Sequence, residues 1–133
     1  MLLTIITFII ILGLLIFVHE FGHFIVAKLA KVKVEEFAFG FPPMLFSIKR
    51  GETRYSLNAI PLGGYVKLFG EEEDTDQQGS FHSKSVFSRA GIVIAGIFMN
   101  FVLAIVLMTI GFSIGMTPLV SDPETLSGQK TLR

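Results

Sequence analysis

Two long apolar stretches without any charged residue dominate the chain. The first runs from Leu2 to Val18 and the second from Ala90 to Met116. As a helix rising about 1.5 Å per residue, the first stretch would span about 26 Å, most of a hydrocarbon core about 30 Å thick. We therefore predict an α-helical polytopic membrane protein, with transmembrane helices over residues 1–30 and 90–116.

The segment between these helices, residues 31–89, has a different pattern. Runs typical of strands alternate with turn signals, and Pro42-Pro43 is expected to break the first run. The expected strands are residues 45–49, 53–60 and 65–69, and the expected turns are residues 50–52 and 61–64. This predicts a curled β-hairpin or small sheet over residues 34–70. It either dips into the membrane edge or packs over the helix ends, and the pattern leaves both open.

Charge is distributed unevenly, although 11 basic and 11 acidic residues balance over the 133 residues. Nine of the basic residues lie between Lys28 and Arg89, next to both predicted spans. Basic residues beside spans favour the cytoplasmic side, so we expect residues 31–89 inside the cell and both chain ends outside. The acidic run at 71–76 is predicted to be a solvated loop, and residues 117–133 the start of an extracytoplasmic tail.

Composition narrows the class of protein. Hydrophobic residues make up 51% of the chain and the mean hydropathy is +0.66, too apolar for an ordinary soluble domain. No basic patch with interleaved aromatic residues is present, so no nucleic-acid partner is expected. Cysteine is absent, which excludes disulfides and thiolate metal sites. A removable signal peptide is not expected, because no basic segment precedes the first apolar run.

The candidate chemistry lies at the end of the first apolar stretch, in the H-E-x-x-H motif from His19 to His23. Residues four apart share one helix face, so His19 and His23 can present both imidazoles to one ion, with Glu20 on the adjoining flank. Two imidazoles and a third ligand hold zinc and leave a position open for water. The metal acidifies that water, and a neighbouring carboxylate can accept its proton and pass it to a leaving amine.

Other polar residues have weaker claims. Asn100 is the only amide in the second span, and it will seek a partner, either another helix or a substrate backbone. His82 lies in a polar stretch and is expected to face solvent. Asp122 and Glu124 are separated from the motif by the second span, so they are poor candidates for a third ligand. An open strand edge in the hairpin could pair with an extended substrate.

Three groups of residues together resemble the site-2 protease family of M50-type intramembrane zinc metalloproteases. They are Val18 to Phe24 around the motif, Tyr55 to Lys67 with its Pro-Leu-Gly-Gly-Tyr sequence, and Phe81 to Asn100 with Lys84, Arg89 and Ala95-Gly96. The similarity extends to about Phe112, and the second and third groups are more specific to the family than H-E-x-x-H alone.

The resemblance implies regulated intramembrane proteolysis in the inner (cytoplasmic) membrane of a bacterium. His19 and His23 would bind Zn²⁺, and Glu20 would be the catalytic residue that activates water. The substrate would be a transmembrane protein resembling an anti-sigma factor, or a signal-peptide remnant, cut near the cytoplasmic side. The hairpin would be a membrane re-entrant β-loop that engages unwound substrate, with Gly63, Gly64 and Asn100 as substrate-binding residues.

The chain also departs from the family pattern. The third zinc ligand of the family is an Asp in an L-D-G element on a later helix, and neither this element nor the expected PDZ module is present. The chain is therefore expected to be the N-terminal catalytic half of a longer enzyme, and alone to hold zinc weakly and not to cleave. Ile97 stands where the family usually has Pro, and Pro42 also departs from the usual loop sequence, which affects local geometry and not the chemistry.

Two other readings stay open. A membrane-anchored H-E-x-x-H protease would place His19 and His23 beyond the headgroups and take a Glu from a soluble domain as third ligand. A non-catalytic membrane interaction module would use the His-Glu-His set structurally. The hairpin and second-span motifs favour the intramembrane protease.

Overall fold

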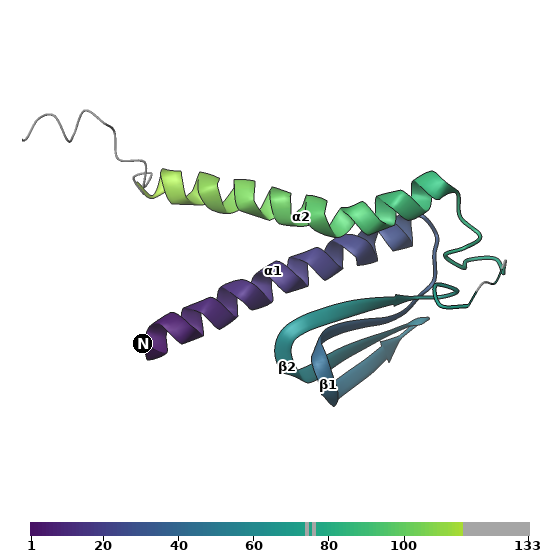
Figure 1. The fold of residues 1–133 in the computed structure, drawn as a ribbon, viewed down its shortest axis with the longest axis horizontal. Helices are drawn as coiled ribbons and strands as arrows, with labels where there is room; N and C mark the ends of the chain where they lie inside the picture. Colours follow the sequence, from purple (N-terminus) through teal and green to yellow (C-terminus); the bar gives the residue numbers. More distant parts are fainter. Residues whose placement is uncertain (74, 76, 116–133) are drawn as a thin grey trace, which may run out of the picture. The chain divides into compact units, whose positions relative to one another are not determined.

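A computed structural model describes residues 1–73, 75 and 77–115 (Figure 1). The elements follow in the order α1 (Leu2–Leu29), β1 (Val34–Arg50), β2 (Thr53–Leu68) and α2 (Val86–Ser113). The chain divides into two units, Met1–Leu103 and Ala104–Arg133, and every contact discussed below lies in the first. Outside the described residues lie the predicted tail with Asp122 and Glu124, and Asp74 and Asp76 of the predicted acidic loop.

α1 is one uninterrupted helix, because no proline or glycine pair breaks its leucine- and isoleucine-rich sequence. It ends in a Schellman motif. The Val32 amide donates to the Ala27 carbonyl at 2.9 Å, and the Lys31 amide donates to the Lys28 carbonyl at 3.0 Å. Lys31 takes the left-handed position of this motif, with φ 56°, where glycine is usual and other residues cost about 1–2 kcal/mol.

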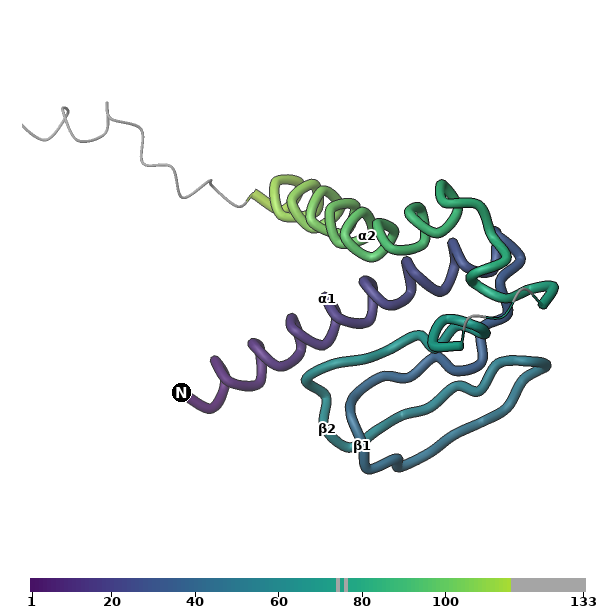
Figure 2. Tube along the Cα trace, turned by 45° about the vertical axis from the view of Figure 1, so that its right-hand side comes forward, coloured from purple at the N-terminus to yellow at the C-terminus, as the bar shows by residue number. Residues whose placement is uncertain are grey.

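The two strands form a curled antiparallel sheet, because each strand doubles back on itself (Figure 2). Residues 36–39 of β1 pair with residues 64–67 of β2 and also with residues 54–57 of β2. The second half of β1, residues 44–50, pairs with residues 53–58. Each strand thus contributes two halves to the sheet, and we call each half a ribbon. The four ribbons are residues 36–39 and 44–50 of β1 and residues 53–58 and 64–67 of β2.

The predicted hairpin is confirmed, but its internal divisions are wrong. The turn between Arg50 and Thr53 lies where it was predicted. The expected break at Pro42-Pro43 and the expected turn at 61–64 are instead bends within continuous strands, and the expected third strand is the second half of β2. The Asn58 side chain stabilises the bend in β1 by donating to the Gly40 carbonyl at 2.9 Å. The residues that flank the bend in β1 keep their places in the ladder, because Phe41 pairs with Ile60 and Met44 pairs with Asn58.

α2 begins at Val86, four residues before the predicted start of the second span. The Ser85 hydroxyl accepts a hydrogen bond from the Ser88 amide at 3.3 Å, and the Ser85 carbonyl accepts one from the Arg89 amide at 3.0 Å. Ser85 is therefore the N-cap residue. The helix starts after this cap, and not at Ala90, where the charge-free stretch begins.

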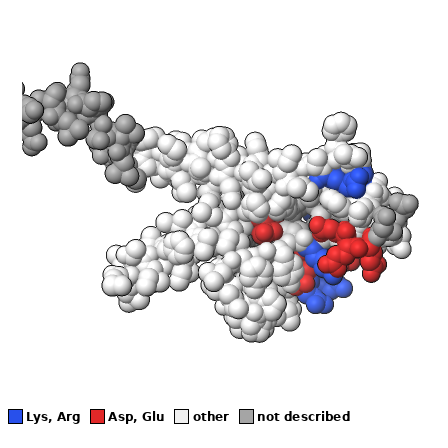
Figure 3. All heavy atoms as spheres, in the orientation of Figure 1, with Lys and Arg blue, Asp and Glu red and all other residues white. Residues whose placement is uncertain are grey.

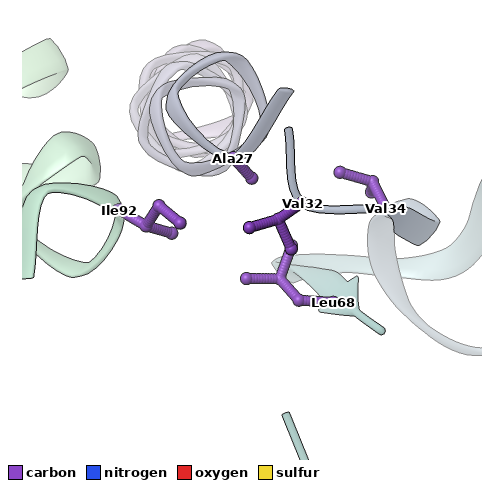
Figure 4. Packing of buried hydrophobic residues seen from close by; sticks show 5 residues of the cluster. All are labelled: Ala27, Val32, Val34, Leu68 and Ile92. Carbon is purple, nitrogen blue, oxygen red and sulfur yellow. The ribbon is translucent and has the colours of Figure 1, made fainter. Parts of the chain in front are cut away.

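A small core joins the two helices to the sheet. Ala27 from α1 and Ile92 from α2 lie against Val32 and Leu68, and these four side chains point toward one another in Figure 4. Val34, at the start of β1, completes the buried cluster. This core fixes the last turns of α1 against the first turns of α2. The H-E-x-x-H motif lies on α1 just before these packed turns.

Candidate metal centre

The two motif histidines converge as the helical spacing predicts. Nε2 of His19 and Nε2 of His23 are 3.2 Å apart, and the ring centroids are separated by 4.8 Å. Two nitrogens that each lie about 2.0–2.1 Å from a tetrahedral zinc ion are about 3.3 Å apart. The two imidazoles therefore already have the separation that a shared zinc ion requires.

Hydrogen bonding fixes which nitrogen of His23 is available. Nδ1 of His23 lies 2.6 Å from the backbone carbonyl oxygen of Ile92 on α2. A carbonyl oxygen only accepts, so Nδ1 carries the proton, and in the neutral ring Nε2 keeps its lone pair. This is the outer-shell arrangement common among metal-binding histidines.

His19 has a side-chain partner instead of a backbone partner. Its Nδ1 lies 3.5 Å from Nδ2 of Asn100, also on α2. The other end of the amide, Oδ1 of Asn100, is buried and has no hydrogen-bond partner among the described residues. The structure thus places Asn100 beside the candidate metal ligand, and the amide has unused hydrogen-bonding capacity.

The backbone of α2 closes over the imidazoles at Gly96. A Cβ atom at this position would collide with Nε2 of His23 and lie 2.7 Å from Nε2 of His19. Any residue larger than glycine would therefore occupy the space where the two nitrogens converge. Gly22 on α1 permits this approach, since a Cβ there would lie 2.5 Å from the Ala95 carbonyl oxygen. The space that Gly22 leaves open on α1 is therefore taken by the backbone of α2.

Glu20 lies beside the second half of β2. A Cβ atom at Gly64 of β2 would lie 3.0 Å from Cγ of Glu20 and 2.9 Å from the Ala38 carbonyl oxygen. Gly63 is oriented differently, because its Cβ position would collide with the ring of Phe41. Of the two glycines predicted to bind substrate, the structure brings only Gly64 next to the motif.

A cavity of about 280 Å³ opens between Glu20, His23 and the second half of β2. Sequence reasoning missed several residues that line it, among them Tyr65, Glu71 and Ile92. Burial, and after it the nearby Glu36 carboxylate, raises the pKa of Tyr65, so its phenol keeps its proton at neutral pH. The Pro-Leu-Gly-Gly-Tyr sequence could have identified Tyr65 as a residue of the site. No sequence pattern could have identified Ile92, because it acts through its backbone carbonyl.

The donor set fits a zinc site that the described residues fill in part. Within residues 1–73, 75 and 77–115, no third His, Asp or Glu side chain joins His19 and His23 in a metal-binding group. His82 lies apart from the pair and donates through Nε2 to the Glu71 carbonyl oxygen at 3.2 Å. Two converging imidazoles, of which the Ile92 carbonyl fixes the lone pair of His23, and a neighbouring carboxylate match the H-E-x-x-H chemistry.

Comparison with known proteins agrees with this geometry. The chain is 50% identical over 111 residues to a protein of Clostridium acetobutylicum named as a zinc metalloprotease, covering 84% of this chain and 32% of that protein. It is 42% identical over 135 residues to Protease RseP of Yersinia pestis, covering 94% of this chain and 30% of the relative. The chain thus spans about a third of the length of these curated relatives. The family model of peptidase family M50 matches residues 7–131, and the chain belongs to this family of site-2 proteases.

Proposed function

We propose that this chain carries the zinc-binding and water-activating residues of an intramembrane metalloprotease of a bacterial cytoplasmic membrane. Such an enzyme hydrolyses peptide bonds in the transmembrane segments of other proteins. The observation that carries the proposal is the pair of Nε2 atoms 3.2 Å apart on α1, with Glu20 opening into the same cavity as His23. The metalloprotease names of the relatives support the reaction class.

Membrane insertion is inferred from the length of the two helices and from their exposed apolar side chains. α1 and α2 each have 28 residues and are long and apolar enough to cross a bilayer. Most large side chains in the first half of α1 are exposed, Phe8 and Ile10 among them. A helix that is apolar all round needs a protein core or lipid around it, and lipid satisfies this need for α1. In Figure 3 most of the visible charges lie near the β2–α2 connection, one acidic group lies apart from them, and most of the remaining surface carries no charge.

The site would lie toward the cytoplasmic edge of the bilayer. Counted from Leu2 at about 1.5 Å per residue, His19 lies about 26 Å along α1, near the far side of a hydrocarbon core about 30 Å thick. Bound zinc would supply an acidified water and polarise the scissile carbonyl. Glu20 would accept a proton from that water and deliver it to the leaving amine, while the Ile92 carbonyl holds His23 in the tautomer that leaves Nε2 free for the metal.

Substrate access is proposed along β2. The ribbon formed by residues 64–67 pairs with residues 36–39 on one side, and no strand among the described residues pairs with it on the other. Gly64, Tyr65 and Val66 of this ribbon line the cavity that contains Glu20. An unwound transmembrane segment can add to this edge as a further strand, with its backbone presented to the site.

The third metal ligand is proposed to come from outside the described residues, since His19 and His23 supply only two protein ligands. Catalytic zinc sites generally have three. Asp122 and Glu124, outside the described residues, are poor candidates on sequence grounds because the second span separates them from the motif, so we expect the 133-residue chain alone to hold zinc weakly and to lack turnover.

Substitution of Glu20 tests the function. In the protein as its gene encodes it, Glu20→Gln should lower cleavage of a transmembrane reporter at least about 100-fold, as loss of a general base does. Zinc content should stay unchanged, because Glu20 is not a ligand. His23→Gln should lose both zinc and cleavage, and His82→Gln, a histidine outside the site, should lose neither. Full cleavage by Glu20→Gln would contradict the proposal and leave a non-catalytic role.

A further inference from the structure

A second concave site lies beyond the metal centre, at the end of α1. This cavity, the lysine pocket, has a volume of about 440 Å³. Four of its eight lining residues are lysines: Lys28, Lys31, Lys33 and Lys84. The lysines come from three places in the chain, namely the last turn of α1, the segment leading into β1, and the approach to α2.

The charge of the pocket is not neutralised within the described part of the chain. Glu52 is the only acidic residue that lines it. The ion pairs found among the described residues both involve Lys67, which lies elsewhere. The ammonium groups of Lys28 and Lys33 instead lie over aromatic rings, 5.9 Å from the centroid of Phe24 and 5.5 Å from that of Phe69. Such contacts orient a lysine without cancelling its charge.

The local backbone holds these lysines in place. Lys31 occupies the left-handed position of the helix end, where glycine would cost less, and this directs the chain from α1 into β1. The Lys33 amide donates to the Gly79 carbonyl at 2.9 Å, and its own carbonyl accepts from the Phe69 amide at 2.9 Å. The pocket is therefore part of the folded structure and not a set of loose side chains.

The position of the lysine pocket along α1 indicates which part of a bilayer would lie beside it, and so which ligand it would meet. A helix of 28 residues is about 42 Å long, close to the 40–45 Å of a bilayer with both headgroup layers. With Leu2 at one edge of the hydrocarbon core, as above, Lys28 lies about 39 Å along α1, about 9 Å past the far edge of a core about 30 Å thick, from where its side chain reaches the headgroup layer. Clustered lysines next to a membrane span at that level attract anionic headgroups.

We propose that the lysine pocket binds the phosphate headgroup of an anionic phospholipid of the cytoplasmic leaflet. The lipid would anchor the end of α1 and the start of β1, close to the metal centre, against the membrane surface. The inference rests on the membrane placement proposed above but not on proteolysis, so it can fail independently of the catalytic proposal.

Spin-labelled lipids test this proposal in the full chain reconstituted in bilayers. Phosphatidylcholine labelled at the same position reports the ordinary lipid contact of a membrane protein, and phosphatidylglycerol reports the pocket. We expect phosphatidylglycerol to be immobilised with at least about tenfold greater affinity than phosphatidylcholine, because each lysine near an anionic headgroup contributes about fivefold. Equal immobilisation of the two lipids would overturn the proposal, and immobilisation of neither would overturn the membrane placement as well.

A matched pair of variants locates the effect. Lys28→Gln, Lys31→Gln and Lys84→Gln combined leave only Lys33 in the pocket and should remove most of the preference. The combination Lys49→Gln, Arg50→Gln and Arg54→Gln removes three positive charges outside the pocket and should retain it. Replacing Lys28, Lys31 and Lys84 by arginine instead keeps the charge and should retain the preference, which distinguishes loss of the site from loss of folding. Inorganic phosphate at 10-fold excess over lipid should not displace the label; if it does, the pocket is a site for soluble anions and the lipid proposal fails.

Discussion

The metal centre has two walls that touch different parts of the motif. The helical wall, formed by α2, contacts the imidazoles: the Ile92 carbonyl binds His23, Asn100 lies beside His19, and Gly96 lies over both rings. The strand wall, formed by the second half of β2, contacts Glu20 through Gly64 and lines the cavity. Ile92 of the helical wall also lines the cavity that contains Glu20, so the two walls meet there.

This division separates two tasks within a single turn of α1. Metal affinity depends on lone-pair direction and ring position, which the helical wall controls. Water activation and substrate position depend on the carboxylate and the peptide beside it, which the strand wall controls. Substitutions in the helical wall should therefore change zinc affinity first, and substitutions in the strand wall should change turnover first.

The largest effect is expected at Gly96. In Gly96→Ala the new methyl group occupies the space between the two Nε2 atoms, so zinc affinity should fall at least about 100-fold, the upper end of effects seen for residues that orient ligands. Competition with a chromophoric chelator measures this loss. Gly91→Ala is the matched control on the same helix, because no atom lies within 4 Å of a Cβ there. Equal zinc affinity in the two variants would show that α2 does not confine the imidazoles.

A smaller effect on the same wall is expected at Asn100. We propose that its amide oxygen accepts the Nδ1 proton of His19 when Nε2 is used as a ligand, after the amide turns over. Asn100→Leu should lower zinc affinity about tenfold, since it keeps the volume and removes the acceptor. Asn100→Asp, which retains an acceptor oxygen, should restore the affinity. Loss in both variants to the same degree would assign Asn100 a packing role only.

The smallest effect is expected on the strand wall, at Gly64. A methyl group in Gly64→Ala would press on Glu20 and on the Ala38 carbonyl, so kcat for a transmembrane reporter should fall about fivefold. Zinc affinity should remain within about twofold of wild type, which is the opposite of the Gly96→Ala result. A parallel loss of zinc would break the division between the walls.

Sequence reasoning reached the parts of the site that follow from periodicity. Four-residue spacing places His19 and His23 on one face of any helix, so their convergence was predictable. The predicted hairpin was confirmed as well, because the turn signals at Gly51-Glu52 are local. Asn100 was recognised as a polar residue in need of a partner, and the structure supplies His19.

Other features depend on tertiary contacts that a single sequence does not encode locally. The Ile92 carbonyl that orients His23 belongs to an apolar residue, and every residue has such a group. The distinction between Gly63 and Gly64 depends on which neighbour packs against each. The bends at Pro42-Pro43 and 61–64 look like strand ends until the residues on both sides of each bend are seen to pair within one sheet. The helix start at Val86 depended on the Ser85 cap, which hydropathy does not detect.

The doubly paired half of β1 also limits how the length of this protein can vary. Residues 36–39 hold a ribbon on each side, so a single residue inserted between Gly40 and Phe46 would slide one ribbon past the other. Because side chains alternate along a strand, such a slip would turn the apolar set away from α1. Insertions and deletions should therefore be tolerated at Gly51-Glu52 and rejected in the bend, and a tag or a crosslinking handle belongs at that turn.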